Sequence, residues 1–309
     1  MHRIVSRTSR GLALLAALVA ALALATGCAA RTSDPPSRGV HVVAAENFWG
    51  SIAAQLVGDR GSVQSIITNP AQDPHSYEPT AGDARSLASA NLDIVNGVGY
   101  DPWASQLLAA NSTKSSQVLD VGTVLGLKDG DNPHRWYEPQ DVERAANAIT
   151  TDLVRLDPQQ AKYFLRRRTT FLDRGLARYH ALIAAIKTRY AGVPVGASES
   201  IFALAAPALG LKLITPYGFM KAISEGTELT AAETASAERQ VTGRQIRVWV
   251  YNSQNSTPEI QRLTALARAH RIPVVPITET LRPRTDTFEQ WQVAQLERLK
   301  EALHEASRT

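Results

Sequence analysis

Two histidines in this 309-residue sequence lie in closely similar local sequences. His75 lies in Asp73-Pro74-His75-Ser76-Tyr77-Glu78-Pro79, and His134 lies 59 positions later in Asn132-Pro133-His134-Arg135-Trp136-Tyr137-Glu138-Pro139. Proline fixes φ and biases the residue before it away from helix, so we expect each imidazole on a stiff, non-helical loop. A lone histidine is more often a surface or hydrogen-bonded residue, but two of only seven histidines share this context. Because neutral imidazole is the commonest protein metal ligand, the repeated motif predicts metal capture.

Glu199 and Asp286 are the carboxylates best placed to complete a ligand set. In open α/β sheets, ligands bind beyond the carboxyl ends of the strands. Each carboxylate lies in a segment that follows an expected strand: Ser198-Glu199-Ser200-Ile201-Phe202 after 193–197, and Arg284-Thr285-Asp286-Thr287-Phe288 after 272–277. Two other interpretations stay open. Glu199 could be stabilised by a helix N-terminus, and Asp286 could cap the helix expected near Phe288.

Short apolar runs rich in β-branched residues alternate with helical patterns from Val40 onward. Such alternation is typical of parallel sheets covered by helices on both faces. We therefore predict an α/β fold with two lobes, each a four-stranded, mainly parallel sheet, spanning 40–156 and 191–309. Helix starts are expected at Asn47, Thr80, Thr230 and Thr257. The expected strands are 40–45, 63–67, 92–95, 118–121, 193–197, 211–215, 246–251 and 272–277.

Residues 157–190 show a different pattern, with apolar residues at steps of three, four and seven that form one stripe on a helix. A helix of this length spans about 45 Å, enough to run along both lobes. Gly175 is a weak point that costs about 1 kcal/mol relative to alanine. We predict a single long helix that links the lobes; the alternative is a long surface helix of one domain.

The first 27 residues resemble a processing signal, with Arg3, Arg7 and Arg10 before the apolar run 11–26. Cys28 is the only cysteine, which excludes disulfides within the chain and a cysteine-based structural zinc site. The small residues before Cys28 resemble a bacterial lipobox, so we expect Cys28 to be lipidated; otherwise it is an incidental small residue near a cleavage site. Residues 28–39 are expected to form a flexible tether.

The charge balance excludes a nucleic-acid partner as the leading interpretation. The full chain carries a net charge of +4, and removal of the three arginines of the signal leaves +1.

Gly97-Val98-Gly99 does not continue as a dinucleotide-binding motif, because Pro102 occupies the place of the third glycine. The sequence contains no Walker A motif, so any transport energy must come from a separate ATPase.

The chain resembles the metal-specific solute-binding lipoproteins of bacterial ABC importers, the zinc/manganese/iron family whose lobes are joined by one long helix. The stretches that carry the resemblance are Ala45-Glu46-Asn47-Phe48-Trp49-Gly50, Asp73 to Pro79, Gly97-Val98-Gly99-Tyr100-Asp101-Pro102-Trp103, Asn132 to Pro139, Ser198 to Phe202 and Asp286-Thr287-Phe288. The resemblance implies that each lobe contributes two ligands to one metal ion, and it places these ligands on His75, His134, Glu199 and Asp286. Glu46, Asp101 and Glu279 lie in comparable loops and are candidates to support the ligands.

By the same resemblance, the protein is not an enzyme. It would capture Mn²⁺ or Zn²⁺, with Fe²⁺ as a further candidate, and deliver it to an ABC permease served by a separate ATPase. The Ser-Glu context of Glu199 is similar to manganese- or iron-type members, and the His/Asp/Glu-rich loop of many zinc-type members is absent. We expect an extracytoplasmic monomer anchored to the cell membrane through Cys28. One departure is Arg135, a cation beside the ligand that is tolerable only if it points to solvent.

Two other function classes remain. A secreted metalloenzyme could use His75, His134 and one carboxylate with an open coordination position for water. A surface adhesin is the second alternative, since lipoproteins of this family have been viewed in that way.

Overall fold

The computed structural model describes residues 39–69, 72, 74, 77–110 and 116–308. His75, Cys28, the signal segment and nearly all of the tether lie outside these residues, so the predictions about them stay predictions.

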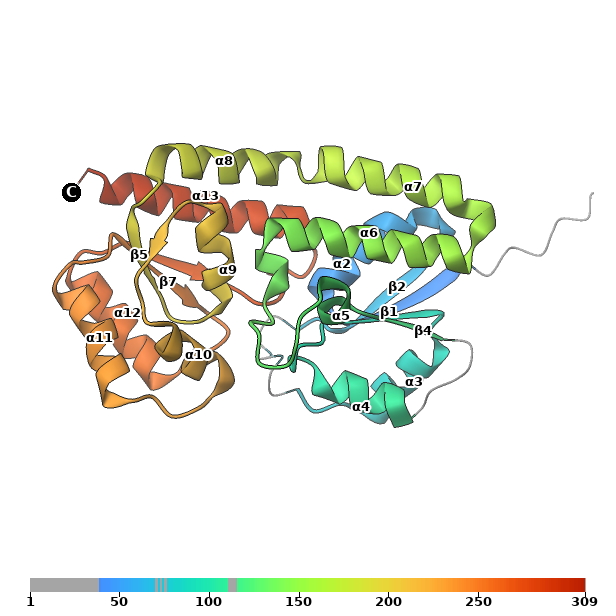
Figure 1. The fold of residues 1–309 in the computed structure, drawn as a ribbon, viewed down its shortest axis with the longest axis horizontal. Coiled ribbons are helices and arrows are strands. Elements are labelled where there is room, and N and C mark those ends of the chain that lie inside the picture. The colour runs from blue at the N-terminus through green and yellow to red at the C-terminus, as the bar shows by residue number, and fades with distance from the viewer. Residues whose placement is uncertain (1–38, 70–71, 73, 75–76, 111–115, 309) are drawn as a thin grey trace, which may run out of the picture. The chain divides into compact units, whose positions relative to one another are not determined.

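The N-terminal lobe is built on a four-stranded parallel sheet with the strand order β2-β1-β3-β4. Its strands are β1 (Val40–Glu46), β2 (Gly61–Ile67), β3 (Leu92–Val95) and β4 (Gln117–Asp120). Its helices are α2 (Asn47–Val57), α3 (Ala81–Ser89), α4 (Pro102–Ala110), α5 (Val121–Leu125) and α6 (Pro139–Leu156), with 3-10 turns η1 (Gly58–Arg60) and η3 (Arg135–Tyr137). Figure 1 shows α3 and α4 on the side of the sheet opposite α2 and α6.

The two faces of this sheet bury different apolar clusters because successive strand residues point to opposite sides. In β1, Val42 and Ala44 belong to the main core, whereas Val43 and Ala45 pack with Trp103 of α4 in a second, smaller cluster. Both faces are therefore covered, as a parallel sheet requires.

The C-terminal lobe repeats this plan with the strand order β6-β5-β7-β8, again all parallel. Its strands are β5 (Pro194–Ala197), β6 (Lys212–Leu213), β7 (Val248–Asn252) and β8 (Val274–Ile277). Its helices are α9 (Ile201–Ala208), α10 (Tyr217–Glu225), α11 (Ala231–Thr242), α12 (Pro258–Ala269) and α13 (Phe288–Ala306). Both sheets belong to one compact unit, residues 39–309. The predicted fold class is confirmed.

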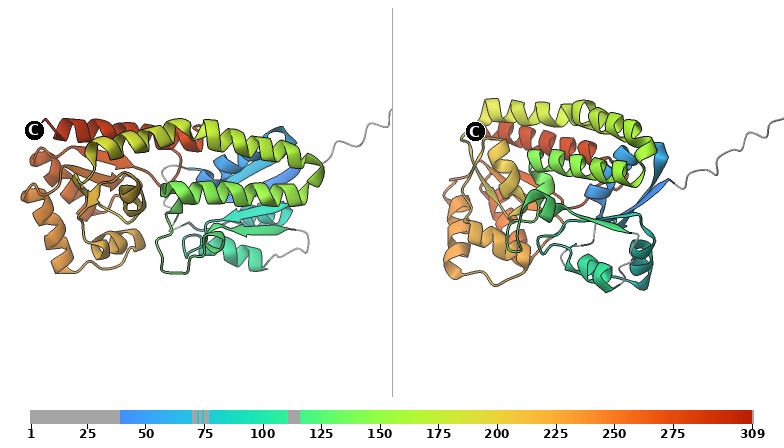
Figure 2. Two further views of the ribbon diagram at one scale, coloured as in Figure 1. Left: turned by 45° about the horizontal axis from the view of Figure 1, so that its top comes forward. Right: turned by 45° about the vertical axis from the view of Figure 1, so that its right-hand side comes forward.

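The long helix predicted at 157–190 is confirmed as the connection, but it is not one uninterrupted α-helix. It consists of a 3-10 turn η4 (Pro158–Gln160), α7 (Ala161–Thr170), a single π-helical turn η5 (Phe171–Gly175) and α8 (Ala177–Tyr190). The π turn is closed by the Leu176 N–H, which donates to the Phe171 carbonyl at 2.9 Å. The helical register thus changes at Gly175. In Figures 1 and 2, α7 and α8 run along both lobes, and α13 lies beside α8.

Three of the four predicted helix starts are confirmed. Thr80 and Thr230 form capping boxes, and Thr257 caps α12 ahead of Pro258. The prediction for Asn47 is wrong because Glu46 is the N-cap residue of α2. The Asn47 Oδ1 instead accepts the Leu281 backbone N–H at 3.1 Å, which joins the two lobes.

None of the helices within the described residues is both long enough and apolar enough to cross a membrane.

Candidate metal site

The carboxyl ends of the C-terminal strands bring buried polar residues to one edge of the sheet. Glu199 lies two residues beyond the end of β5, Asn252 is the last residue of β7, and Glu279 lies two residues beyond the end of β8. All three side chains are almost fully buried, at 1%, 0% and 1% exposure. Burial of carboxylates is unfavourable unless they are paired or bind a cation, so this edge is the natural place for a ligand.

The Glu199 and Glu279 carboxylates both accept hydrogen bonds from the side-chain amide of Asn252. The Asn252 Nδ2 donates to Glu199 Oε2 at 3.1 Å and to Glu279 Oε1 at 2.7 Å. Two neighbouring buried carboxylates repel each other when both are ionised, and a bound cation removes that repulsion. Glu199 directly precedes Ser200, the N-cap residue of α9, so the helix dipole also favours its charge.

His134 approaches this acidic pair from the N-terminal lobe. It lies directly before η3 and is fully buried. Its ring meets the Tyr100 ring edge-to-face at 5.8 Å between centroids, and the Tyr100 hydroxyl donates to Glu279 Oε2 at 2.6 Å. Tyr100 therefore connects a candidate ligand of one lobe to a candidate ligand of the other.

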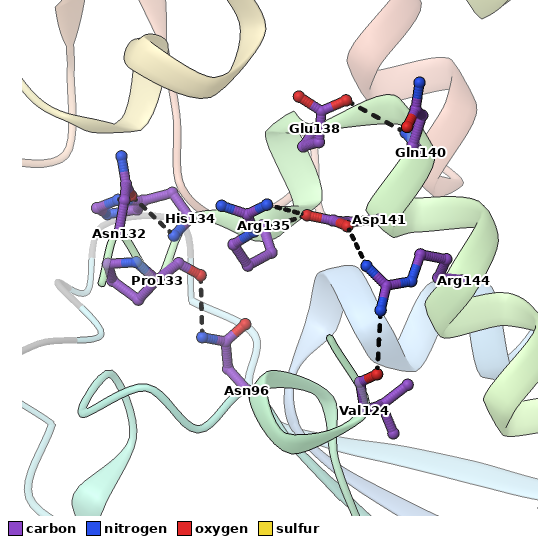
Figure 3. Close-up of polar contacts among 10 residues, drawn as sticks. All are labelled: Asn96, Val124, Asn132, Pro133, His134, Arg135, Glu138, Gln140, Asp141 and Arg144. Atoms are coloured by element: carbon purple, nitrogen blue, oxygen red, sulfur yellow. Dashed lines mark hydrogen bonds and ion pairs between the residues drawn. The ribbon is translucent and has the colours of Figure 1, made fainter. Parts of the chain in front are cut away.

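The loop before His134 is held by a chain of amide contacts (Figure 3). The Trp49 indole donates to Asn96 Oδ1 at 3.0 Å, and Asn96 Nδ2 donates to the Pro133 carbonyl at 3.1 Å. The sequence provided no signal for Asn96, because its role depends on contacts with residues far away in the chain.

Arg135 was expected to point to solvent, but it does not. Its charge is instead balanced by an acidic partner. Its guanidinium pairs with the buried Asp141 of α6, which also accepts from Arg144 at 3.4 Å (Figure 3). Arg144 in turn donates to the Val124 carbonyl at 3.2 Å. The Asp141 carboxylate thus neutralises the Arg135 charge, and this ion pair joins the His134 loop to α6.

Asp286 lies apart from this group in the contacts of the described residues. It is half-buried in the loop before α13, where its backbone N–H donates to the Pro283 carbonyl at 3.1 Å. The alternative role as a helix cap is also not realised, because Thr287 caps α13. Among the described residues, the contacts therefore join Glu199 to Glu279 through Asn252 and link Glu279 to the His134 ring through Tyr100, and they do not include the Asp286 side chain.

The sequence did contain a signal for Glu279. It follows β8 at the same distance at which Glu199 follows β5, so the strand-end rule favours Glu279 over Asp286 once the strand ends are known. Within the described part of the chain, no group of three or more His, Cys, Asp or Glu side chains is arranged to hold a metal ion. His75, the other histidine predicted as a ligand, lies outside that part.

Glu46 and Asp101 form a second buried acidic pair in the N-terminal lobe. Burial, and then the neighbouring Asp101 carboxylate, hold the pKa of Glu46 well above its usual range. Burial raises the pKa of Asp101 to about 6, although the backbone N–H groups of Asn96 and Gly97 donate to it at 2.7 and 2.8 Å. Through these two backbone contacts the Asp101 carboxyl group anchors the turn before Tyr100.

That turn is strained, which shows how strictly Tyr100 is placed. Gly97, Val98 and Gly99 have φ values of 71°, 58° and 73°, and a β-branched residue such as Val98 rarely adopts this conformation. The Tyr100 N–H closes the turn on the Gly97 carbonyl at 3.0 Å. Strain of this kind is typical of functional sites.

A cavity of about 250 Å³ reaches His134 from outside. Both lobes line it, with Val98, Gly99 and residues 130–134 on one side and Ser200, Tyr217, Lys221, Ser224 and Glu225 on the other.

Residues 42–302 match the family model described as zinc-uptake complex component A, periplasmic. The manganese-binding lipoprotein MntA of Halalkalibacterium halodurans is 28% identical over 157 residues, which are 48% of this chain and 51% of that protein. The iron-binding protein YfeA of Yersinia pestis is 27% identical over 213 residues, which are 65% of this chain and 67% of that protein. The chain therefore spans about half of the first relative and two thirds of the second.

Among solved structures, the Mn-bound periplasmic metal-binding protein from Candidatus Liberibacter asiaticus is similar with a TM-score of 0.71. The similarity covers 85% of this chain and 99% of that chain at 18% identity. The two chains share a fold.

Proposed function

We propose, from the premise that this chain belongs to the ZnuA family of periplasmic metal-binding solute-binding proteins, that it captures a divalent transition metal ion outside the cytoplasm and delivers it to an ABC permease. Members of this family are solute-binding proteins and not enzymes. The metal ion is cargo, and a separate ATPase supplies the energy for import.

The proposed ligands are His75 and His134 from the N-terminal lobe and Glu199 and Glu279 from the C-terminal lobe. Glu279 takes the place that was predicted from the sequence for Asp286. The observation that carries this assignment is the single Asn252 amide shared by the Glu199 and Glu279 carboxylates, because it holds two buried anionic groups in adjacent positions. A divalent cation between the lobes would neutralise both.

This ligand set favours Mn²⁺ or Fe²⁺ as cargo. Two imidazoles with two carboxylates make a harder and more anionic site than three imidazoles with one carboxylate, and carboxylates that bind through both oxygens allow coordination above four. Intrinsic affinity still rises from Mn²⁺ towards Zn²⁺, so Zn²⁺ is expected to bind tightly in solution whichever ion is imported.

The place of action follows from the first 28 residues. A cleaved signal and a lipid on Cys28 would leave the protein outside the cytoplasm, attached to the membrane by the tether 28–39, and close to the permease.

Metal analysis of protein purified without chelator, followed by competition titration, tests the proposal. We expect one divalent ion per chain and loss of binding in the double variant Glu199→Gln, Glu279→Gln. Full retention of binding in that variant, or no binding of any divalent ion by the wild-type chain, would refute the assignment.

A further inference from the structure

Asn132 makes hydrogen bonds in both lobes. Its side-chain Oδ1 lies 3.1 Å from the backbone nitrogen and 2.9 Å from the ring Nδ1 of His134. Its Nδ2 lies 2.7 Å from the backbone carbonyl of Ser200, which is 68 residues away in the C-terminal lobe. One half-buried amide thus connects the His134 ring to the residue that follows Glu199.

The neighbours of Asn132 determine which way its amide is turned. The backbone N–H of His134 can only donate, so it requires the amide oxygen, and the Ser200 carbonyl can only accept, so it requires the amide nitrogen. The opposite orientation would place nitrogen against N–H and oxygen against carbonyl, and both contacts would be repulsive.

This orientation determines the tautomer of His134. Because the amide oxygen faces Nδ1, that nitrogen must carry a proton to complete the contact. A neutral imidazole carries one proton, so Nε2 is left with the lone pair that a metal ion requires. Outer partners of metal-binding histidines commonly set the tautomer in this way, and their loss costs 10–100-fold in metal affinity.

The two histidine motifs differ at this position. The first motif has aspartate before its proline, at Asp73, and the second has asparagine, at Asn132. A carboxylate could accept from an imidazole N–H but could not donate to a carbonyl. Asparagine is the residue that can do both.

We infer that Asn132 has a dual positioning role: it holds His134 in the tautomer that coordinates metal through Nε2, and it fastens the His134 loop to Ser200 when the lobes are closed. The inference rests on the proposed function, since it treats His134 as a metal ligand. It adds that one side chain, Asn132, both sets the His134 tautomer and stabilises the closed arrangement of the lobes. Loss of the Ser200 contact should therefore loosen the closed form even when the tautomer is intact.

The substitution Asn132→Asp separates the two roles, and Asn132→Ala removes both. The aspartate keeps an acceptor for Nδ1 but places an oxygen against the Ser200 carbonyl. Asn147→Asp and Asn147→Ala on the exposed face of α6 are matched controls.

Two-bond ¹H–¹⁵N correlation spectra of the metal-free full chain at pH 8 report the tautomer of each histidine. The His134 signals are identified because they are lost in the variant His134→Gln. We expect the Nδ1–H form in the wild type and in Asn132→Asp, and a detectable fraction of the Nε2–H form in Asn132→Ala. A wild-type His134 protonated on Nε2, or an unchanged tautomer in Asn132→Ala, would overturn the first role.

Closure is measured by small-angle X-ray scattering without metal and by the rate of Mn²⁺ release into a chelator. Asn132→Asp should increase the radius of gyration and speed release by about tenfold; values equal to those of Asn147→Asp would overturn the second role. If the wild type binds no divalent ion, the proposed function fails, while the tautomer and the scattering still decide this inference.

Discussion

The Tyr100 hydroxyl donates a 2.6 Å hydrogen bond to Oε2 of Glu279, and both side chains are only 1% exposed. The two residues are 179 positions apart and belong to different lobes. The same Tyr100 ring meets the His134 ring edge-to-face. A phenol at this point both orients a candidate carboxylate ligand and packs against a candidate imidazole ligand.

Tyr100→Phe should preserve the ring packing and remove the bond to Glu279. Because this bond orients a ligand from outside the coordination shell, we expect metal affinity to fall by about 10-fold to 100-fold. Competition titration with a chromogenic chelator measures the change. The control is Tyr163→Phe, which removes a hydroxyl that accepts the Asp59 N–H in the N-terminal lobe. Equal affinities for the two variants would contradict the role of Tyr100.

Glu279→Gln and Asp286→Asn form a matched pair that decides the fourth ligand. Loss of a ligand should exceed the 10-fold to 100-fold cost of losing a supporting contact, so we expect a drop of more than about 100-fold for Glu279→Gln. Asp286→Asn should stay within about twofold of wild type, because the Asp286 carboxylate belongs to no metal-holding group within the described residues and shares no contact there with Glu199 or Glu279. Calorimetric titration of both variants gives the comparison, and the reverse order would restore Asp286 as the ligand.

Glu199→His should raise the ratio of Zn²⁺ affinity to Mn²⁺ affinity. The substitution removes an anionic oxygen and adds a borderline nitrogen at the same strand end. Paired competition titrations with the two ions measure the ratio in a variant shown by circular dichroism to be folded. A ratio that stays the same or falls would mean that Glu199 is not a ligand or that ligand hardness does not set selectivity here.

Asp93→Asn should make stability less dependent on pH. Asp93 of β3 is fully buried, neither of its oxygens has a hydrogen-bond partner among the described residues, and burial raises its pKa to about 7. Between pH about 4 and 7 the folded chain keeps this proton while the unfolded chain has lost it, so stability falls as pH rises through that window.

The amide that replaces the Asp93 carboxyl group in this variant would not ionise, so we expect a higher melting temperature than wild type at pH 8 and a smaller difference at pH 4. Thermal unfolding followed by circular dichroism at pH 8 and at pH 4 measures the two differences in melting temperature. A variant that is destabilised equally at both pH values would show that the Asp93 carboxyl group does not titrate in this range.

Cys28→Ala should release the protein from membranes or leave its precursor uncleaved. One acyl chain gives only weak anchoring, so several chains are expected on Cys28. Membrane fractionation and mass spectrometry of the mature protein test this. An unmodified Cys28 in a soluble mature chain would rule out the anchor.

The sequence by itself determined the elements and the class of fold, because these depend on local patterns. Alternating β-branched runs and 3.6-residue stripes specify strands and helices within a few residues, and all eight expected strands occur in the structure. The Pro-His motifs likewise predicted His75 and His134 as ligands from neighbours in the chain alone, and that assignment stays a prediction. These signals are local because backbone geometry and side-chain periodicity are local.

Only the tertiary structure decided which carboxylates meet and what holds them. The strand ends of β5 and β8 favour Glu199 and Glu279, whereas the sequence alone had placed Asp286, further along the loop after β8, in the ligand set and Glu279 among the supporting residues. Partnerships such as Asn132 with Ser200 join residues that are distant in sequence. Their formation depends on how two sheets and their loops pack, and neither residue type nor spacing encodes that packing in a form that can be read without the folded chain.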